Sequence, residues 1–527
     1  MFKVLVADPI SEKGINILKE NENVQVDVKL KLAEDEIASI IEDYQAIIVR
    51  SGVKVTRKII ENASNLKIIA RAGVGVDNID LEAATENGVV VVNAPEGNTI
   101  AAAEHTIAMI TGIARNVPQA HAELRQGKWE RKKYMGVELR DKVLGVVGLG
   151  KIGTEVIKRA IALEMRILGY DPFISEEMAS KLGIELADLE TIYKEADIIT
   201  MHVPKTDKTK HMLGAEQFEM MKPTTYIVNV ARGGIIDEEA LYEAIKNNKI
   251  AGAALDVFES EPATDSPLFE FNSVVVTPHL GASTEEAQVN VAIDVAKDVK
   301  RVIEGKFVKN PVNIPAVKNE YKDVLNPYLE LMEKMGKICS KLGEGRLNKI
   351  EVKYSGELAN YDTTSLTNTC LKGLLRPTLG DEVNYVNAPY IAKNRDIKVK
   401  ESKTSEIEKY ANLVRLELTT DAGVRSVEGT IFKQGEFRIV AIDGYSIDVD
   451  PKGHLLIVPH TDKPGIIGLV GTYLGEDNIN IAGMQVGRKE LGGIAVMVLA
   501  VDEAVSEETI EKINKIEAVV DVKYVKL

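Results

Sequence analysis

The chain has 527 residues, of which 45% are hydrophobic and 28% charged, and its formal net charge is −15. This length is too great for one hydrophobic core and predicts two to four domains. The acidic balance argues against nucleic acid or an anionic membrane as a partner. No apolar run reaches the roughly 18 residues that cross a bilayer. Two cysteines cannot form a disulfide framework or a CxxC site, so no metal is expected.

Short apolar strands alternate with helical segments over residues 2–98. This rhythm predicts a parallel α/β sheet. We expect its strands at residues 3–7, 24–28, 46–49, 67–70 and 89–93. The chain starts with a short strand in place of a signal peptide, which favours a cytoplasmic protein.

Two of these strands end in cationic turns, at residues 50–52 and 71–75. Ligands bind at the carboxyl ends of strands in such sheets, so Arg50, Ser51 and Arg71 face a candidate site. The alternative is a pair of solvated surface arginines.

A long apolar segment at residues 99–114 predicts a helix buried between layers. We interpret His105 within it as a core histidine. Residues 128–133 hold the only tryptophan and a basic cluster. This cluster either contacts an anion, across a dimer interface, or forms a solvated loop.

A glycine-rich turn after residue 147 has the context of a dinucleotide site. Strand residues 143–147 run into Gly148, Gly150 and Gly153, and an amphipathic helix follows. The three glycines allow a tight turn, close approach of a pyrophosphate, and close helix packing. A second strand ends in Asp171, at the distance expected for the acid that binds the ribose 2′-OH. That carboxylate would repel a 2′-phosphate, so NAD is favoured over NADP.

Three later strands also end in ionisable residues, namely Arg232, Glu261 and His279. If the strands are parallel, these side chains share one edge of the sheet. A histidine can take a hydroxyl proton, a carboxylate can orient its ring, and a guanidinium can clamp a substrate carboxylate. His202, which also ends a strand, is the rival base. Separate structural salt bridges are the alternative for the whole set.

These motifs resemble the D-isomer-specific 2-hydroxyacid dehydrogenases over residues 1–314. The resemblance implies that Arg232 binds the substrate, Glu261 orients the ring and His279 is the acid/base. It implies a Rossmann cofactor domain (99–282) inserted in a flavodoxin-like substrate domain (1–98 and 283–315). The implied NAD contacts are Gly148, Gly150, Lys151, Ile152, Gly153, Asp171, Val230, Ala231, Arg232, Asp256, His279, Leu280, Gly281 and Ala282.

The rest of the chain divides in two. Residues 305–315 are typical of a linker, and residues 316–452 predict an α+β domain without evident chemistry. Residues 453–527 follow a βαββαβ pattern that resembles an ACT regulatory domain. This resemblance implies that His460, Asp462 and Asn480 bind serine between paired ACT domains, in a homodimer or homotetramer.

Turns at 71–78, 93–98 and 127–131 are similar to a branch of the family that acts on a small phosphorylated hydroxy acid. Arg50, Ser51 and Arg71 would hold that substrate. Many relatives have threonine where Val74 and Val203 stand, so only backbone contacts to the cofactor remain there. Two alternatives stay open, which are a dehydrogenase for another small D-2-hydroxy acid and an NAD-binding sensor or corepressor.

Overall fold

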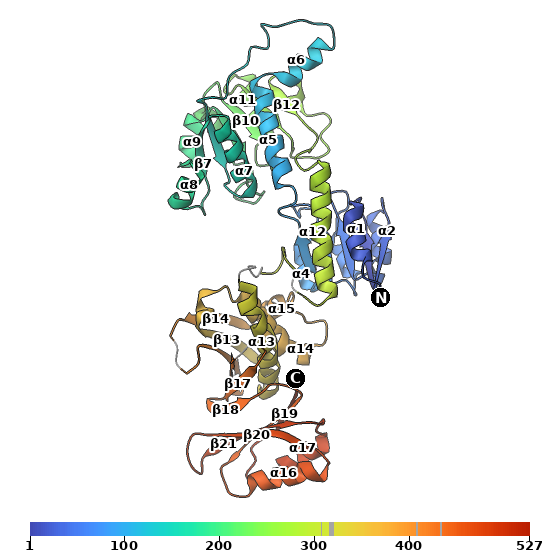
Figure 1. The fold of residues 1–527 in the computed structure, drawn as a ribbon, viewed down its shortest axis with the longest axis vertical. Coiled ribbons are helices and arrows are strands. Elements are labelled where there is room, and N and C mark those ends of the chain that lie inside the picture. The colour runs from blue at the N-terminus through green and yellow to red at the C-terminus, as the bar shows by residue number, and fades with distance from the viewer. Residues whose placement is uncertain (307, 316–320, 407–408, 433–434) are drawn as a thin grey trace.

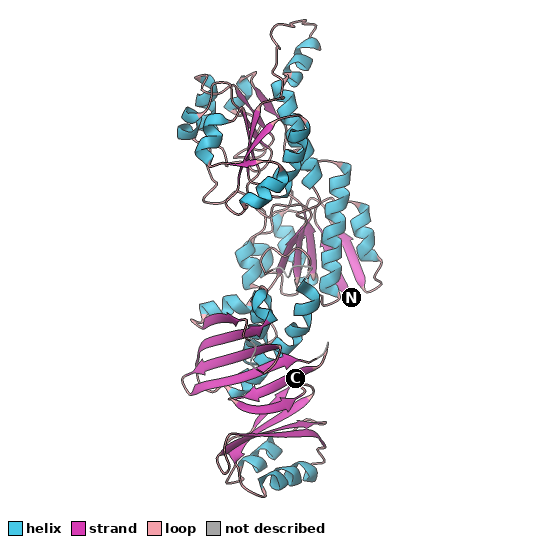
Figure 2. Ribbon diagram, turned by 60° about the vertical axis from the view of Figure 1, so that its left-hand side comes forward, coloured by secondary structure: helices cyan, strands magenta, loops and turns pink. Residues whose placement is uncertain are grey.

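The computed structural model describes residues 1–306, 308–315, 321–406, 409–432 and 435–527. Four sheets follow one another along the long axis of the molecule, each with its own helices (Figures 1 and 2). The expected start of the α+β domain at residue 316 lies outside the described residues.

The first sheet has five parallel strands in the order β2-β1-β3-β4-β5. This is the flavodoxin-like order, as predicted. Its strands are β1 (Phe2–Val6), β2 (Val24–Val28), β3 (Ala46–Val49), β4 (Ile68–Arg71) and β5 (Val90–Asn93). Its helices are α1 (Glu12–Lys19), α2 (Glu34–Ile40), α3 (Arg57–Glu61), α4 (Leu81–Glu86) and the returning α12 (Glu285–Ile303), which packs on α1.

The second sheet has seven parallel strands in the order β12-β11-β10-β9-β6-β7-β8. This is the Rossmann strand order with one added strand. The direction in which successive strands are added to the sheet reverses between β6 and β9, which is where a dinucleotide binds in such folds. Its strands are β6 (Val143–Val147), β7 (Arg166–Tyr170), β8 (Glu185–Leu186), β9 (Ile198–Met201), β10 (Tyr226–Asn229), β11 (Gly252–Leu255) and β12 (Val274–Val276). Its helices are α5 (Thr99–Ala114), α6 (Val117–Leu124), α7 (Lys151–Ala162), α8 (Glu176–Leu182), α9 (Leu189–Glu195), α10 (Ala215–Met220) and α11 (Glu238–Lys246).

The segment expected to be a linker is in part bound to the first sheet. Pro311 bridges to Val92, and the Asn313 side chain accepts from Val91 N at 2.8 Å and donates to Val89 O at 2.9 Å. The segment satisfies backbone groups of the edge strand β5, so residues 310–313 extend the sheet rather than leave it.

The third sheet is mixed, in the order β14-β13-β15-β16-β17-β18, with three helices. Its strands are β13 (Leu347–Gly356), β14 (Lys398–Thr404), β15 (Asn412–Thr420), β16 (Gly423–Ile431), β17 (Phe437–Ile442) and β18 (Tyr445–Val449), and its helices are α13 (Lys322–Leu342), α14 (Thr364–Leu379) and α15 (Ala388–Asn394). Both cysteines are buried in this core, and burial raises the pKa of the Cys370 thiol to about 12.

The fourth sheet, in the order β20-β21-β19-β22, carries two helices. Its elements are β19 (His454–Thr461), α16 (Ile466–Glu476), β20 (Ile481–Arg488), β21 (Ile494–Val501), α17 (Glu507–Asn514) and β22 (Lys523–Lys526). The element order βαββαβ is the predicted one. Among the described residues, no helix combines the length and apolar character that a membrane span needs.

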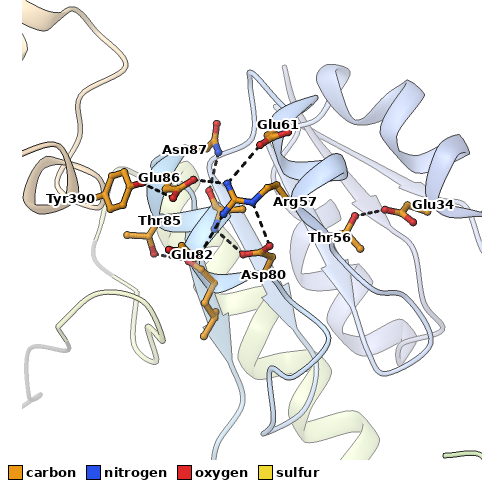
Figure 3. Close-up of polar contacts among 12 residues, drawn as sticks. Glu34, Thr56, Arg57, Glu61, Asp80, Glu82, Thr85, Glu86, Asn87 and Tyr390 are labelled. Atoms are coloured by element: carbon orange, nitrogen blue, oxygen red, sulfur yellow. Dashed lines mark hydrogen bonds and ion pairs between the residues drawn. The ribbon is translucent and has the colours of Figure 1, made fainter. Parts of the chain in front are cut away.

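A polar cluster joins the domain of the first sheet to the domain of the third sheet (Figure 3). Arg57 Nη1 lies 2.6 Å from Glu86 Oε2, and the Tyr390 hydroxyl on α15 donates to Glu86 Oε1 at 2.6 Å. Asn384 also donates to Gly88 O, at 3.0 Å. The Arg57 side chain is 40% exposed, so water and salt screen its ion pairs and each contributes little to stability.

Candidate active site

The glycine turn after β6 has the shape that a dinucleotide needs. Gly148 has φ +98°, and a Cβ there would lie 2.5 Å from His202 O. A Cβ on Gly153 would lie 2.1 Å from Gly148 O, whereas one on Gly150 would meet no described atom within 4 Å. The turn is therefore tight on its inner side and open at Gly150, where a pyrophosphate can approach the N-terminus of α7.

Asp171 lies directly beside this turn. Its Oδ2 accepts from Leu149 N and its Oδ1 from Phe173 N, both at 2.9 Å. These bonds fix the carboxylate at the carboxyl end of β7, where an adenosine ribose would lie. Lys151, at the start of α7, forms an ion pair with Glu96, which follows β5 of the first sheet (Nζ–Oε1 2.7 Å).

Arg232, Glu261 and His279 follow β10, β11 and β12, which are parallel neighbours. The three residues therefore leave the same edge of the sheet. His279 Nδ1 lies 2.8 Å from Glu261 Oε2, while Glu261 Oε1 accepts from Phe258 N at 3.1 Å. Because Nδ1 faces the carboxylate, Nε2 is the nitrogen that can exchange a proton with a ligand.

His279 has φ +57°, an uncommon conformation that a buried carboxylate stabilises. Asp256 accepts from Leu280 N at 2.7 Å and Gly281 N at 2.8 Å, and also from Thr277. Burial alone raises the pKa of Asp256, but hydrogen bonds from His105, Thr277 and the two amides outweigh it and lower the pKa below its usual value. Asp256 and His105 thus support the His279 loop. His105 contacts Thr277 and Asp256 through Nε2, so it has the polar partners expected of a core histidine.

The rival histidine occupies a different environment. Burial lowers the pKa of His202 to about 4, and its ring bonds Thr200 Oγ1 at 3.1 Å. A general base works best with a pKa near the operating pH. The partly exposed His279, paired with a carboxylate, is therefore better suited to proton transfer.

Arg50, Arg71 and Arg232 lie close together beside this edge, and Arg232 Nε is 3.3 Å from Asp77 Oδ2. Arg71 is half-buried, and its buried Nε has no hydrogen-bond partner in the described part of the chain. Burial and the charge of Arg232 lower the pKa of Arg71 to about 10, against the opposing charges of Asp77 and Asp8. The positive charge of Arg71 is therefore only partly compensated, and an anionic ligand would relieve its cost. Ser51 lies exposed in the adjacent turn.

Four residues that shape this arginine cluster were not evident from the sequence. A Cβ on Gly73 would lie 1.9 Å from Arg71 Nη1, and one on Gly75 would lie 2.0 Å from Arg232 Nη2. Both glycines therefore leave room for a guanidinium. Buried Asp8 accepts from Arg50 N at 2.7 Å, and Asn78 donates to Arg50 O at 2.7 Å. Asp8 follows β1 closely, and an acidic residue after a strand of this sheet could have indicated a place at the site.

The three candidate effector residues lie at two ends of the fourth sheet. His460, on β19, is 2% exposed, and Asp462 follows it, 3.3 Å from Arg488 at the end of β20. Asn480 precedes β20 and donates to Asp502 Oδ2 at 2.6 Å. The register aligns His460 with Arg488 and Ile481 with His454, each through β21. Seven residues of strand separate these positions, on the order of 20 Å, so one chain does not unite the set.

The fold and the strand-edge residues define a dehydrogenase of the Rossmann type, and solved structures agree. Residues 107–281 match the NAD binding domain of the D-isomer specific 2-hydroxyacid dehydrogenases. D-lactate dehydrogenase from Aquifex aeolicus, complexed with NAD and lactic acid, is 27% identical with a TM-score of 0.54, covering 60% of this chain and 100% of that one. The Escherichia coli D-lactate dehydrogenase apo-structure is 29% identical with a TM-score of 0.53, covering 59% and 100%.

The C-terminal half narrows the class. Residues 324–443 match the D-3-phosphoglycerate dehydrogenase intervening domain, and residues 454–518 match the ACT domain. D-3-phosphoglycerate dehydrogenases from Archaeoglobus fulgidus (48% identical), Methanocaldococcus jannaschii (49%) and Bacillus subtilis (42%) align over 100% of both chains. The chain belongs to the D-3-phosphoglycerate dehydrogenase family, and it is an NAD-dependent oxidoreductase with an ACT domain.

Proposed function

We propose that the chain oxidises D-3-phosphoglycerate to 3-phosphohydroxypyruvate with NAD, the first step of L-serine biosynthesis. The observation that carries the proposal is the half-buried Arg71, whose buried Nε has no partner among the described residues and whose charge lies close to those of Arg232 and Arg50. Asp77 and Asp8 compensate this positive charge only in part. A substrate with a phosphate and a carboxylate supplies further anionic charge, and guanidinium groups bind both anions bidentately.

Each residue at the strand edge then has a role. His279 Nε2 takes the hydroxyl proton, and Glu261, at 2.8 Å from Nδ1, orients the ring and stabilises its charged form. Arg232 clamps the substrate carboxylate, while Arg50, Ser51 and Arg71 hold the remainder of the substrate. A bound NAD would supply the acceptor for the hydride that leaves the carbinol carbon, while the hydroxyl proton on that carbon goes to His279 Nε2.

The NAD site comprises the open glycine turn, Asp171 and the loops that follow β10 and β12. The space at Gly150 and the fixed Asp171 carboxylate support this placement. The proposed contacts remain those implied by the family, namely Gly148, Gly150, Lys151, Ile152, Gly153, Asp171, Val230, Ala231, Arg232, Asp256, His279, Leu280, Gly281 and Ala282.

Serine is the proposed effector, bound between the ACT domains of two chains in a homodimer or homotetramer. ACT domains bind amino acids, and serine is the end product of the proposed reaction sequence. The separation of His460 and Asp462 from Asn480 within one chain supports a site shared by two chains.

The test follows NADH absorbance with 3-phosphohydroxypyruvate, beside glyoxylate, pyruvate and 2-oxoglutarate, with and without serine. We expect strong preference for the phosphorylated keto acid and inhibition by serine. Preference for an unphosphorylated keto acid would contradict the proposed substrate but would still support a 2-hydroxyacid dehydrogenase reaction. No turnover with any substrate would favour an NAD-binding sensor.

A further inference from the structure

The loop that carries Glu261 is tied to helix α11 by a reciprocal pair of hydrogen bonds. Glu259 N donates to Glu238 Oε1 at 2.6 Å, and Glu238 N donates to Glu259 Oε1 at 3.3 Å. Helix α11 begins at Glu238, six residues after Arg232. The pair therefore joins the segment that carries Arg232 to the segment that carries Glu261.

His211 adds a third segment to this junction. Its Nε2 lies 2.9 Å from Glu259 Oε1, and its backbone N donates to Gly234 O at 2.9 Å. Its Nδ1 lies 3.8 Å from Asp237 Oδ2, the N-cap residue of α11. His211 has φ +51°, so the loop bends sharply where it contacts both strand-end segments.

The packing at this junction leaves little room for movement. A Cβ on Gly233 would lie 1.7 Å from Phe258 O, so the two strand-end segments are in backbone contact. Phe258 N donates to Glu261 Oε1, and Glu261 Oε2 faces His279 Nδ1. A shift of the backbone at residues 258–259 would therefore move Glu261 and then the imidazole. Burial, with the charges of Glu259 and Glu261, raises the pKa of Glu238.

We propose that Glu238, supported by His211, is a positioning residue for the acid–base pair: its carboxylate holds the Glu259 backbone and so sets the Glu261–His279 geometry. The inference rests on the proposed function, because it assigns Glu238 a role in that reaction. Neither Glu238 nor His211 needs to touch the substrate for this role.

The first test compares Glu238→Ala, Glu238→Gln and the control Glu239→Ala. We expect Glu238→Ala to lower kcat for phosphohydroxypyruvate reduction about 10- to 100-fold, since a misplacement of about 1 Å can cost on the order of 100-fold. The KM for NADH should stay within about twofold. Glu238→Gln keeps an oxygen acceptor for Glu259 N and should recover kcat to within about threefold. Glu239 is exposed on the same turn of α11, and Glu239→Ala should change nothing.

The second test combines Glu238→Ala with Glu261→Ala. If Glu238 acts through Glu261, the double variant should be no slower than Glu261→Ala alone, within about threefold. A full additional loss in the double variant, or an unchanged kcat in Glu238→Ala, would overturn the inference while the wild type stays active. An inactive wild type would instead overturn the proposed function. If Glu238→Ala does not fold, His211→Ala gives the same comparison from the other side of Glu259.

Discussion

The carboxyl edge of the second sheet brings its candidate residues together within one chain, whereas the fourth, ACT sheet keeps its candidate residues apart. Arg232, Glu261 and His279 come from three neighbouring parallel strands of one sheet, and Glu261 already contacts His279. Asp462 and Asn480 lie at opposite ends of the fourth sheet. The chemistry is thus assembled by the fold of one chain, whereas the proposed effector site needs two chains.

The difference follows from where each residue lies on its strand. In an all-parallel sheet every strand ends at the same edge, so residues that follow different strands converge there. Strands β19 and β20 both pair antiparallel with β21 and so run in the same direction, but Asp462 follows the end of β19 whereas Asn480 precedes the start of β20. The two residues therefore lie at opposite ends of the sheet, and a site that contains both needs two chains.

The largest expected effect comes from removing the proposed base. His279→Asn should lower turnover about 10²- to 10⁴-fold, the usual contribution of general acid–base catalysis. NAD binding, measured by fluorescence quenching, should change far less than turnover, because the glycine turn and Asp171 stay in place. Unchanged turnover in His279→Asn would transfer the role to His202, so His202→Asn is the matched comparison.

Arg71 separates substrate binding from stability. Arg71→Met should raise the KM for 3-phosphohydroxypyruvate roughly 100-fold, because the substrate anion loses a buried partner. The same change should raise the melting temperature of the free protein, because burial and the charge of Arg232 disfavour the Arg71 charge more than Asp77 and Asp8 favour it. A lower melting temperature with an unaltered KM would show that Arg71 is only structural.

The next prediction concerns the proposed contact of Asp171 with the cofactor ribose. Asp171→Ala should reduce the NAD over NADP ratio of kcat/KM by about tenfold or more, as expected for a lost hydrogen bond to a charged group and removal of a charge that repels the 2′-phosphate. The ratio is measured from initial rates with each cofactor. An unaltered ratio would mean that Asp171 does not reach the ribose.

The smallest effect concerns the return segment. Asn313→Ala removes three hydrogen bonds that join this segment to β5 and α4. It should lower the free energy of unfolding by about 1–3 kcal/mol, measured by urea denaturation, because backbone groups lose their partners. Asn310→Ala is the control, as no hydrogen bond is assigned to its side chain within the described residues. Equal stabilities would show that residues 310–313 are a linker after all.

Local patterns predicted the first two sheets well. Strands 24–28 and 46–49 and the helix at 99–114 have the predicted bounds, because parallel strands and buried helices leave continuous apolar runs. The positions of Arg50, Arg71, Arg232, Glu261 and His279 at strand ends followed from the same patterns.

Contacts between distant segments were not predictable in this way. Asp8 binds the Arg50 turn across 42 residues, and Glu238 binds Glu259 across 21. Gly73 and Gly75 resemble ordinary turn glycines until two arginines are seen to fill the space beside them. Strands β14 and β18 of the third sheet were missed because each is exposed along part of its length and lacks a long apolar run.

The most direct test of the contrast between the two sites uses mixed oligomers. Asp462→Ala and Asn480→Ala chains should each lose serine inhibition, with the half-inhibitory concentration raised about tenfold or more. A hybrid of the two variants retains one intact shared site and should regain part of the inhibition. A hybrid of His279→Asn with Arg232→Leu chains, whose catalytic sets lie within single chains, should stay inactive. A serine-insensitive first hybrid, or an active second one, would contradict the account.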